Sequence, residues 1–224
     1  MKVEMGESLF YSWLRHHDDK QCQVVQTNWK RSSSWELQNE HELKQFMNAT
    51  YEHFQFKKIL LSQLLKQAEI DVVGICMSER VVKKIYAIDV AFHESGFLYV
   101  NRKETVTRVI KKCIRTALCL HGYFNTREGE IIFASPKIGK SIMDDLELCI
   151  ADLNSLFQGN GYYFTAKVIA NDEFNKDVLT PMLEASSGVS DTTELFMRGF
   201  QLVSMFKKSV DRPAKPSKTA TDSQ

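Results

Sequence analysis

Two apolar runs, each with one aspartate and separated by a short polar turn, restrict the fold of this chain more than any other feature. They are residues 69–76 (EIDVVGIC) and 84–94 (KIYAIDVAFHE). Their β-branched residues favour strands, and residues 78–80 between them are typical of a hairpin connection, so we expect two antiparallel neighbours. An ionised carboxylate in a buried strand costs several kcal/mol unless a cation or proton offsets it. Asp71 and Asp89 are therefore expected to lie close together and to form a divalent metal site.

Composition predicts one soluble, folded protein in the cytoplasm. The chain has 224 residues, of which 43% are hydrophobic and 25% charged, so disorder and coiled-coil composition are disfavoured. Because the net charge is only +1, a basic surface would have to arise from uneven placement of the charged residues. The five cysteines are odd in number and form no C-x-x-C pair, which predicts reduced, mostly buried thiols. No segment approaches the ~20 apolar residues of a membrane span, so we expect no membrane partner.

The hydrophobic periodicity predicts an α/β fold. Alternation of strand, helix, strand, helix and strand after residue 80 indicates parallel crossovers on one sheet. We expect one domain over residues 1–206 and a disordered tail over 207–224, which holds two of the four prolines. The expected elements are a helix at 6–16, a strand at 22–29, a helical insertion at about 35–68, the two aspartate strands, a helix at 105–124, a strand at 130–135, a helix at 142–157, a strand at 162–170 and a helix at 191–206.

With these aspartates and this order of elements, the chain resembles the PD-(D/E)XK nucleases, the restriction-endonuclease-like superfamily, in its Holliday-junction-resolvase-like branch. The resemblance implies a mixed central sheet flanked by helices, with the helical insertion after the first strand. It implies a metal-dependent nuclease that hydrolyses DNA phosphodiester bonds with Mg²⁺ or Mn²⁺. It places Glu7, Asp71 and Asp89 as the catalytic metal ligands. Glu69 and Glu52 compete with Glu7 for the third position.

One departure from the family pattern concerns the catalytic cation. Ala91 stands two residues after Asp89, where the family has the lysine that positions or activates the attacking water. Some members of the superfamily move this lysine to another element. His93 shares the strand face of Asp89 in the predicted pattern and can act as a base near neutral pH. The candidate replacements are Lys103, Lys111, Lys30 and His93.

The helix at 105–124 and the residues just before it carry a basic face. Such a charge run is usually a solvated helix surface, but beside a phosphodiesterase site it becomes a candidate surface for binding nucleic acid. It would neutralise backbone phosphates and give salt-sensitive binding without base readout. Together with Lys30, the expected nucleic-acid contacts are Arg102, Lys103, Arg108, Lys111, Lys112 and Arg115.

Two alternative interpretations stay open. Ala91 is also what a catalytically inactive nuclease-fold protein would show, one that binds DNA or a protein partner. In a purely structural α/β protein, Asp71 would bond a turn amide and Asp89 would pair with a cation such as Lys84. Nucleases that act on two strands often need two sites, which favours a homodimer.

Overall fold

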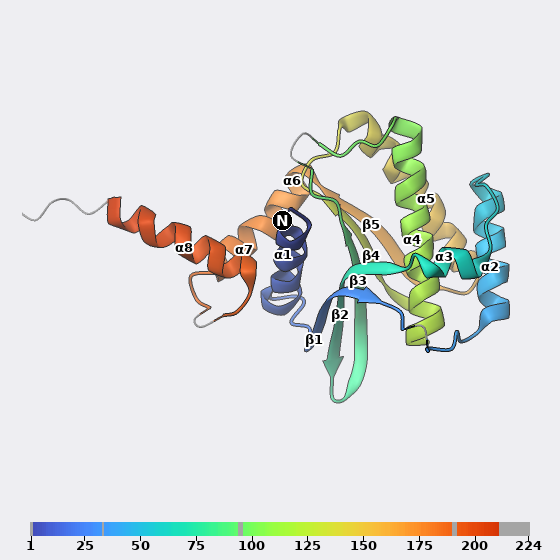
Figure 1. Ribbon diagram of the computed structural model, residues 1–224, viewed down its shortest axis with the longest axis horizontal. Helices are drawn as coiled ribbons and strands as arrows, with labels where there is room; N and C mark the ends of the chain where they lie inside the picture. The colour runs from blue at the N-terminus through green and yellow to red at the C-terminus, as the bar shows by residue number, and fades with distance from the viewer. Residues whose placement is uncertain (1, 33, 94–95, 190–191, 211–224) are drawn as a thin grey trace, which may run out of the picture.

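A five-stranded mixed sheet forms the centre of the computed structural model, which describes residues 2–32, 34–93, 96–189 and 192–210 (Figure 1). In space the strands follow their order in the chain: β1 (Val24–Lys30), β2 (Glu69–Ser78), β3 (Val81–Val90), β4 (Glu128–Ser135) and β5 (Tyr163–Ala170). The pairs β1–β2 and β2–β3 are antiparallel, whereas β3–β4 and β4–β5 are parallel. The expected α/β class, the antiparallel aspartate strands and the parallel crossovers are confirmed.

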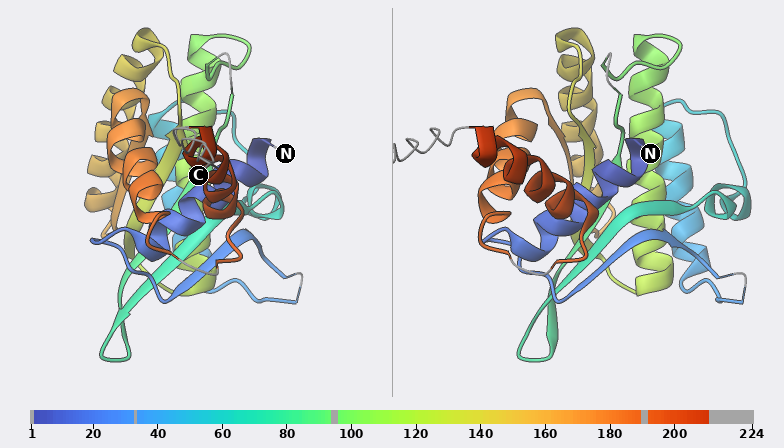
Figure 2. Two further views of the ribbon diagram at one scale, coloured as in Figure 1. Left: turned by 90° about the vertical axis from the view of Figure 1, so that its left-hand side faces the viewer. Right: turned by 60° about the vertical axis from the view of Figure 1, so that its left-hand side comes forward.

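Helices cover both faces of the sheet (Figures 1 and 2). The sheet therefore separates the hydrophobic core into two clusters, one on each face. One cluster packs against α4 (Arg102–Phe124) and α5 (Lys140–Gly159), with α2 (Glu40–His53) and α3 (Leu61–Lys66) outside α4. The other packs beneath α1 (Lys2–His16), together with α8 (Leu195–Val210) and the helical segment formed by α6 (Asn171–Glu173), the π-helical η1 (Phe174–Leu179) and α7 (Thr180–Ala185). Ala87 and Ala91 belong to the first cluster and Ile88 and Val90 to the second, as the alternation along a strand requires.

The connection between the aspartate strands is a tight hairpin. Ser78 pairs with Val81, so only Glu79 and Arg80 lie in the loop. Both adopt left-handed conformations, with φ of 52° and 68°, which is the geometry of two-residue turns that match strand twist.

Several element boundaries differ from the expectation. The insertion is two short helices, because the chain leaves the helical conformation at Phe54 and Gln55 takes a φ of 54°. Helix α4 begins at Arg102, where Oδ1 of Asn101 accepts the N–H of Glu104 at 2.8 Å and caps the first turn. The segment α6–η1–α7 was not expected. Helix α8 continues to Val210, and residues 211–224 of the expected tail lie outside the described residues.

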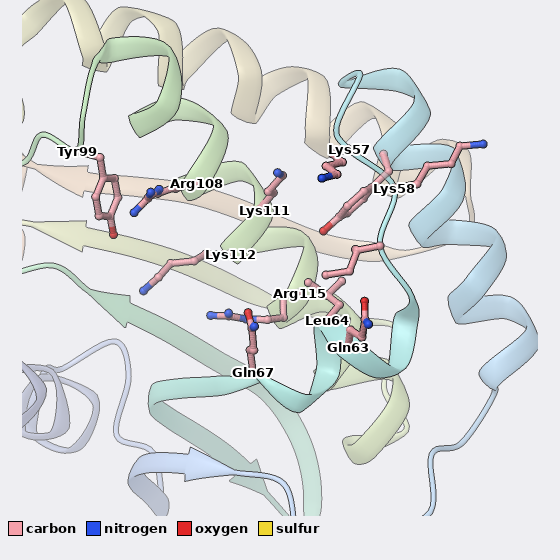
Figure 3. A pocket seen from close by; sticks show the side chains of 12 residues that line it. Lys57, Lys58, Gln63, Leu64, Gln67, Tyr99, Arg108, Lys111, Lys112 and Arg115 are labelled. Atoms are coloured by element: carbon pink, nitrogen blue, oxygen red, sulfur yellow. The ribbon is translucent and has the colours of Figure 1, made fainter.

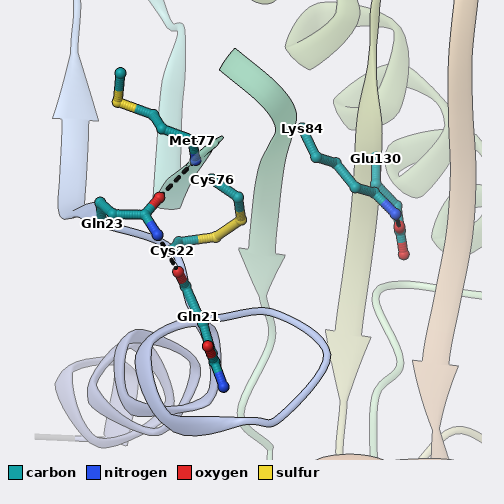
Figure 4. The surroundings of a disulfide bond; sticks show 7 residues. All are labelled: Gln21, Cys22, Gln23, Cys76, Met77, Lys84 and Glu130. Atoms are coloured by element: carbon teal, nitrogen blue, oxygen red, sulfur yellow. Dashed lines mark hydrogen bonds and ion pairs between the residues drawn. A yellow bond between two sulfur atoms is a disulfide. The ribbon is translucent and has the colours of Figure 1, made fainter. Parts of the chain in front are cut away.

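A disulfide joins Cys22 to Cys76 (Figure 4). Because Val24 of β1 pairs with Ile75 of β2, the two cysteines meet across the strands, with Cα atoms 4.0 Å apart. The expectation of five reduced thiols is therefore wrong for this pair, since strand register is not readable from cysteine spacing. The thiols Cys113, Cys119 and Cys149 are free, and burial raises the pKa of the first two to about 12.

Within the described ranges, every helix is too short or too polar to cross a membrane.

Candidate functional site

Asp71 and Asp89 come together at the centre of the sheet. Val72 pairs with Ile88, so the next rung of the antiparallel ladder brings the two aspartates opposite each other on the α4 face. Asp89 is only 2% exposed. The expectation drawn from the sequence, that these two carboxylates are neighbours, agrees with this register.

Helix α4 supplies both partners of the Asp89 carboxylate. Nζ of Lys112 lies 3.2 Å from Oδ1, and the Thr116 hydroxyl donates to Oδ2 at 3.2 Å. The two residues are four apart and therefore lie on one face of the helix. Burial disfavours the charged form of Lys112, but Asp89 and Asp71 outweigh it and raise the lysine pKa above its ordinary value. Lys112 is thus a cation paired with Asp89 and favoured by the nearby charge of Asp71.

The Asp71 carboxylate is held by the backbone of the neighbouring strand. Its Oδ2 accepts the N–H of Val90 at 2.6 Å. Burial raises the pKa of Asp71 to about 6, and the charge of Asp89 adds to this, while the Val90 hydrogen bond and Lys112 oppose it. The site therefore has less positive charge than its two carboxylates would need to ionise fully near pH 6.

Glu7 lies on α1, which covers the other face of the sheet, and acts on Asp71 through its charge. It is 4% exposed, and its Oε2 accepts a hydrogen bond from Nδ2 of Asn28 on β1 at 2.6 Å. Its charge is one of those that raise the pKa of Asp71. The competing candidates lie elsewhere: Glu69 pairs with Lys30 at 3.0 Å, and Glu52 is exposed on α2.

The cation at the carboxylates is not one of the four candidates expected to replace the family lysine. Lys103 lines a separate hollow with Phe54 and Val106, and Lys30 is paired with Glu69. His93 lies beyond the end of β3, exposed, with its ring 5.7 Å from that of Phe97, so strand alternation does not place it beside Asp89. Lys111 points into a cleft described below.

Lys112 was expected only as a nucleic-acid contact. Its position at the carboxylate is set by packing, because Val109 and Thr116, at i−3 and i+4 from Lys112, are both buried. Lys112 is thus at the border of the buried face of α4, not in the middle of the basic one. The structural partner considered for Asp89, Lys84, instead binds Glu130 at 2.5 Å.

A metal would find two carboxylates here rather than three. Within residues 2–32, 34–93, 96–189 and 192–210, no three His, Cys, Asp or Glu side chains are grouped so that they could hold an ion. Mg²⁺ commonly binds through one or two carboxylates and keeps several waters, so the Asp71–Asp89 pair fits this ion. The raised pKa of Asp71 agrees, since a divalent cation would supply the missing positive charge.

A basic cleft of about 660 Å³ begins at Lys112 and lies between α4 and the insertion (Figure 3). Of the expected nucleic-acid contacts, Arg108, Lys111, Lys112 and Arg115 line it. Arg102 does not, because its guanidinium forms a two-pronged ion pair with Asp145 on α5. The insertion contributes a wall that sequence reasoning did not connect with the basic helix: Lys57, Lys58, Gln63 and Gln67.

Comparison with known proteins adds no relative: no family model, curated protein or solved structure matches this chain.

Proposed function

We propose that this protein is a metal-dependent nuclease of the restriction-endonuclease-like class that hydrolyses DNA phosphodiester bonds. The observation that carries the proposal is the contact between Lys112 and Asp89, which puts a cation beside the paired carboxylates although Ala91 stands in the usual lysine position. The five-stranded mixed sheet with helices on both faces fits the α/β class in general, and the assignment to the nuclease fold is part of the proposal.

Each residue has a role that follows from its surroundings. Asp71 and Asp89 offer carboxylate oxygens on one face of two adjacent strands, the ligand type that Mg²⁺ and Mn²⁺ prefer. A bound divalent ion lowers the pKa of a water and offsets charge on the phosphate oxygens. Lys112 donates hydrogen bonds from a fixed position, so it can orient a water or hold a phosphate oxygen. Thr116 keeps Asp89 turned toward Lys112, and Glu7 adds negative charge from α1.

The test is cleavage of plasmid and branched DNA by the purified chain with Mg²⁺ or Mn²⁺. We expect Asp89→Asn and Lys112→Gln each to lower the rate at least about 100-fold. Lys83→Gln, an exposed lysine on β3, is the matched control and should cut normally. Circular dichroism of each variant separates loss of chemistry from loss of folding.

Metal-dependent cleavage that survives both Asp71→Ala and Asp89→Ala would overturn the site. DNA binding without cleavage under every metal would support the alternative suggested by Ala91, a nuclease-fold protein that binds DNA but no longer cuts it.

A further inference from the structure

The basic cleft holds more positive charge than its surroundings neutralise. Six cationic side chains line it, and no carboxylate does so among the described residues: Lys57, Lys58, Arg108, Lys111, Lys112 and Arg115. Glu104 pairs with Arg108 at 2.7 Å and Asp89 with Lys112. In the part of the chain that the structure describes, no carboxylate pairs with the other four. Like charges around one cavity repel, so the cleft is built for an anion with several charges.

Aromatic rings help to hold two of the cations in position. Arg108 lies over the Tyr99 ring at 4.4 Å, and Lys111 over the Phe56 ring at 4.8 Å. The Nε atom of Arg115 is buried and has no hydrogen-bond partner among the described residues. A buried donor without an acceptor costs stability. The Arg115 side chain also lines the cleft, where a phosphate oxygen would be a charge-assisted acceptor for the guanidinium.

The size of the cleft favours a single strand of nucleic acid over a duplex. At about 660 Å³ it is in the range of pockets that enclose small ligands, whereas a duplex carries its phosphates on a broad convex surface. A single strand can enter such a cleft with its backbone along the cations and its bases against the partly exposed Tyr99 ring. The amides of Gln63 on α3 and of Gln67, which follows α3, offer further hydrogen-bonding groups along one wall.

From this geometry we propose that the cleft between α4 and the insertion binds a single strand of DNA and leads it to the aspartates. Lys112 connects the two regions, because it lines the cleft and contacts Asp89. The inference rests on the proposed function in one respect, namely that the bound DNA strand is led toward the carboxylates of Asp71 and Asp89. Its binding component does not depend on cleavage. Substrates with a single-stranded arm, such as flaps and splayed ends, are the class that this arrangement would accept.

The experiment measures binding of a fluorescent single strand of about 12 nucleotides by anisotropy in EDTA, so that no cleavage occurs. We expect the double variant Lys57→Gln/Lys58→Gln to weaken binding about tenfold. It should also reduce the slope of log affinity against log salt by about 1.4, because each phosphate that a lysine neutralises on a single strand adds about 0.7 to that slope. Both lysines are exposed, so their replacement leaves the core intact. A duplex of the same sequence should lose less than about twofold in affinity.

Lys44→Gln/Lys83→Gln is the control, with the same loss of charge on exposed lysines outside the cleft. It should bind the single strand as the wild type does. The inference is overturned if the cleft variant binds normally, or if duplex and single strand lose affinity equally. A protein that binds single strands through Lys57 and Lys58 but never cuts would contradict the proposed function alone, and one that cuts normally after their loss would contradict this inference alone.

Discussion

Nζ of Lys112 lies 3.2 Å from Oδ1 of Asp89, so helix α4 supplies the cation beside this carboxylate of strand β3. Asp89 is almost fully buried, and removal of its partner would leave a carboxylate without charge compensation. We expect Lys112→Met to lower the free energy of unfolding by about 3 kcal/mol, measured by urea denaturation. Asp89→Asn in the same chain should recover part of this loss. Equal stability of Lys112→Met and the wild type would show that the contact is not formed in solution.

The pH dependence of stability follows from Asp71. Its pKa is about 6 in the folded protein and near 4 in an unfolded chain, so the unfolded state releases its proton first. Between about pH 4 and pH 6 the folded state binds more protons, and stability falls as pH rises, by about 2–3 kcal/mol in total. Denaturation in EDTA should show this fall in the wild type. Asp71→Asn should lack it, and identical pH profiles would contradict the raised pKa.

The Cys22–Cys76 disulfide closes a loop whose ends are 54 residues apart. Such a bond restricts the unfolded chain, so Cys22→Ser/Cys76→Ser should lose about 2–4 kcal/mol of stability. Mass spectrometry of the wild type alkylated in denaturant should show three modified cysteines before reduction and five after. Cys149→Ser, at a partly exposed free thiol, is the control and should leave stability unchanged. A wild type that alkylates at five positions without reductant would contradict the bond.

Glu194 attaches the segment before α8 to α1. Its carboxylate accepts the Ser12 hydroxyl at 2.5 Å and lies 2.9 Å from Nε2 of His16, and Ser12 and Glu194 are both buried. Glu194→Ala should cost about 1–3 kcal/mol and make the chain at residues 192–198 more sensitive to proteolysis. Glu184→Ala, an exposed carboxylate on α7, should do neither.

Much of the sheet could be predicted because its information is local. The runs around Asp71 and Asp89 are apolar enough to require strands, and the two-residue loop at Glu79 and Arg80 leaves antiparallel pairing as the simple outcome. Those facts also bring the two carboxylates together, so the predicted pair agrees with the described geometry.

The lysine could not be placed in the same way. Lys111 and Lys112 are neighbours in a basic sequence, and only the rotation of α4 against the sheet decides which one meets Asp89. The disulfide was missed for a related reason, since it depends on the register of β1 against β2. Contacts between segments that are distant in the sequence depend on how the segments pack, so the residue pattern of one segment alone does not predict them.

The carboxylate site and the opposite wall of the basic cleft come from separate stretches of the sequence. Asp71, Asp89 and Lys112 all follow residue 68, whereas the opposite wall of the cleft belongs wholly to the insertion before it. Strand β1 pairs directly with β2 on either side of that insertion. Under the proposed function, surface changes on residues 54–67 would alter which molecules bind while Asp71, Asp89 and Lys112 stay in place, so one contiguous stretch of sequence would set the choice of substrate.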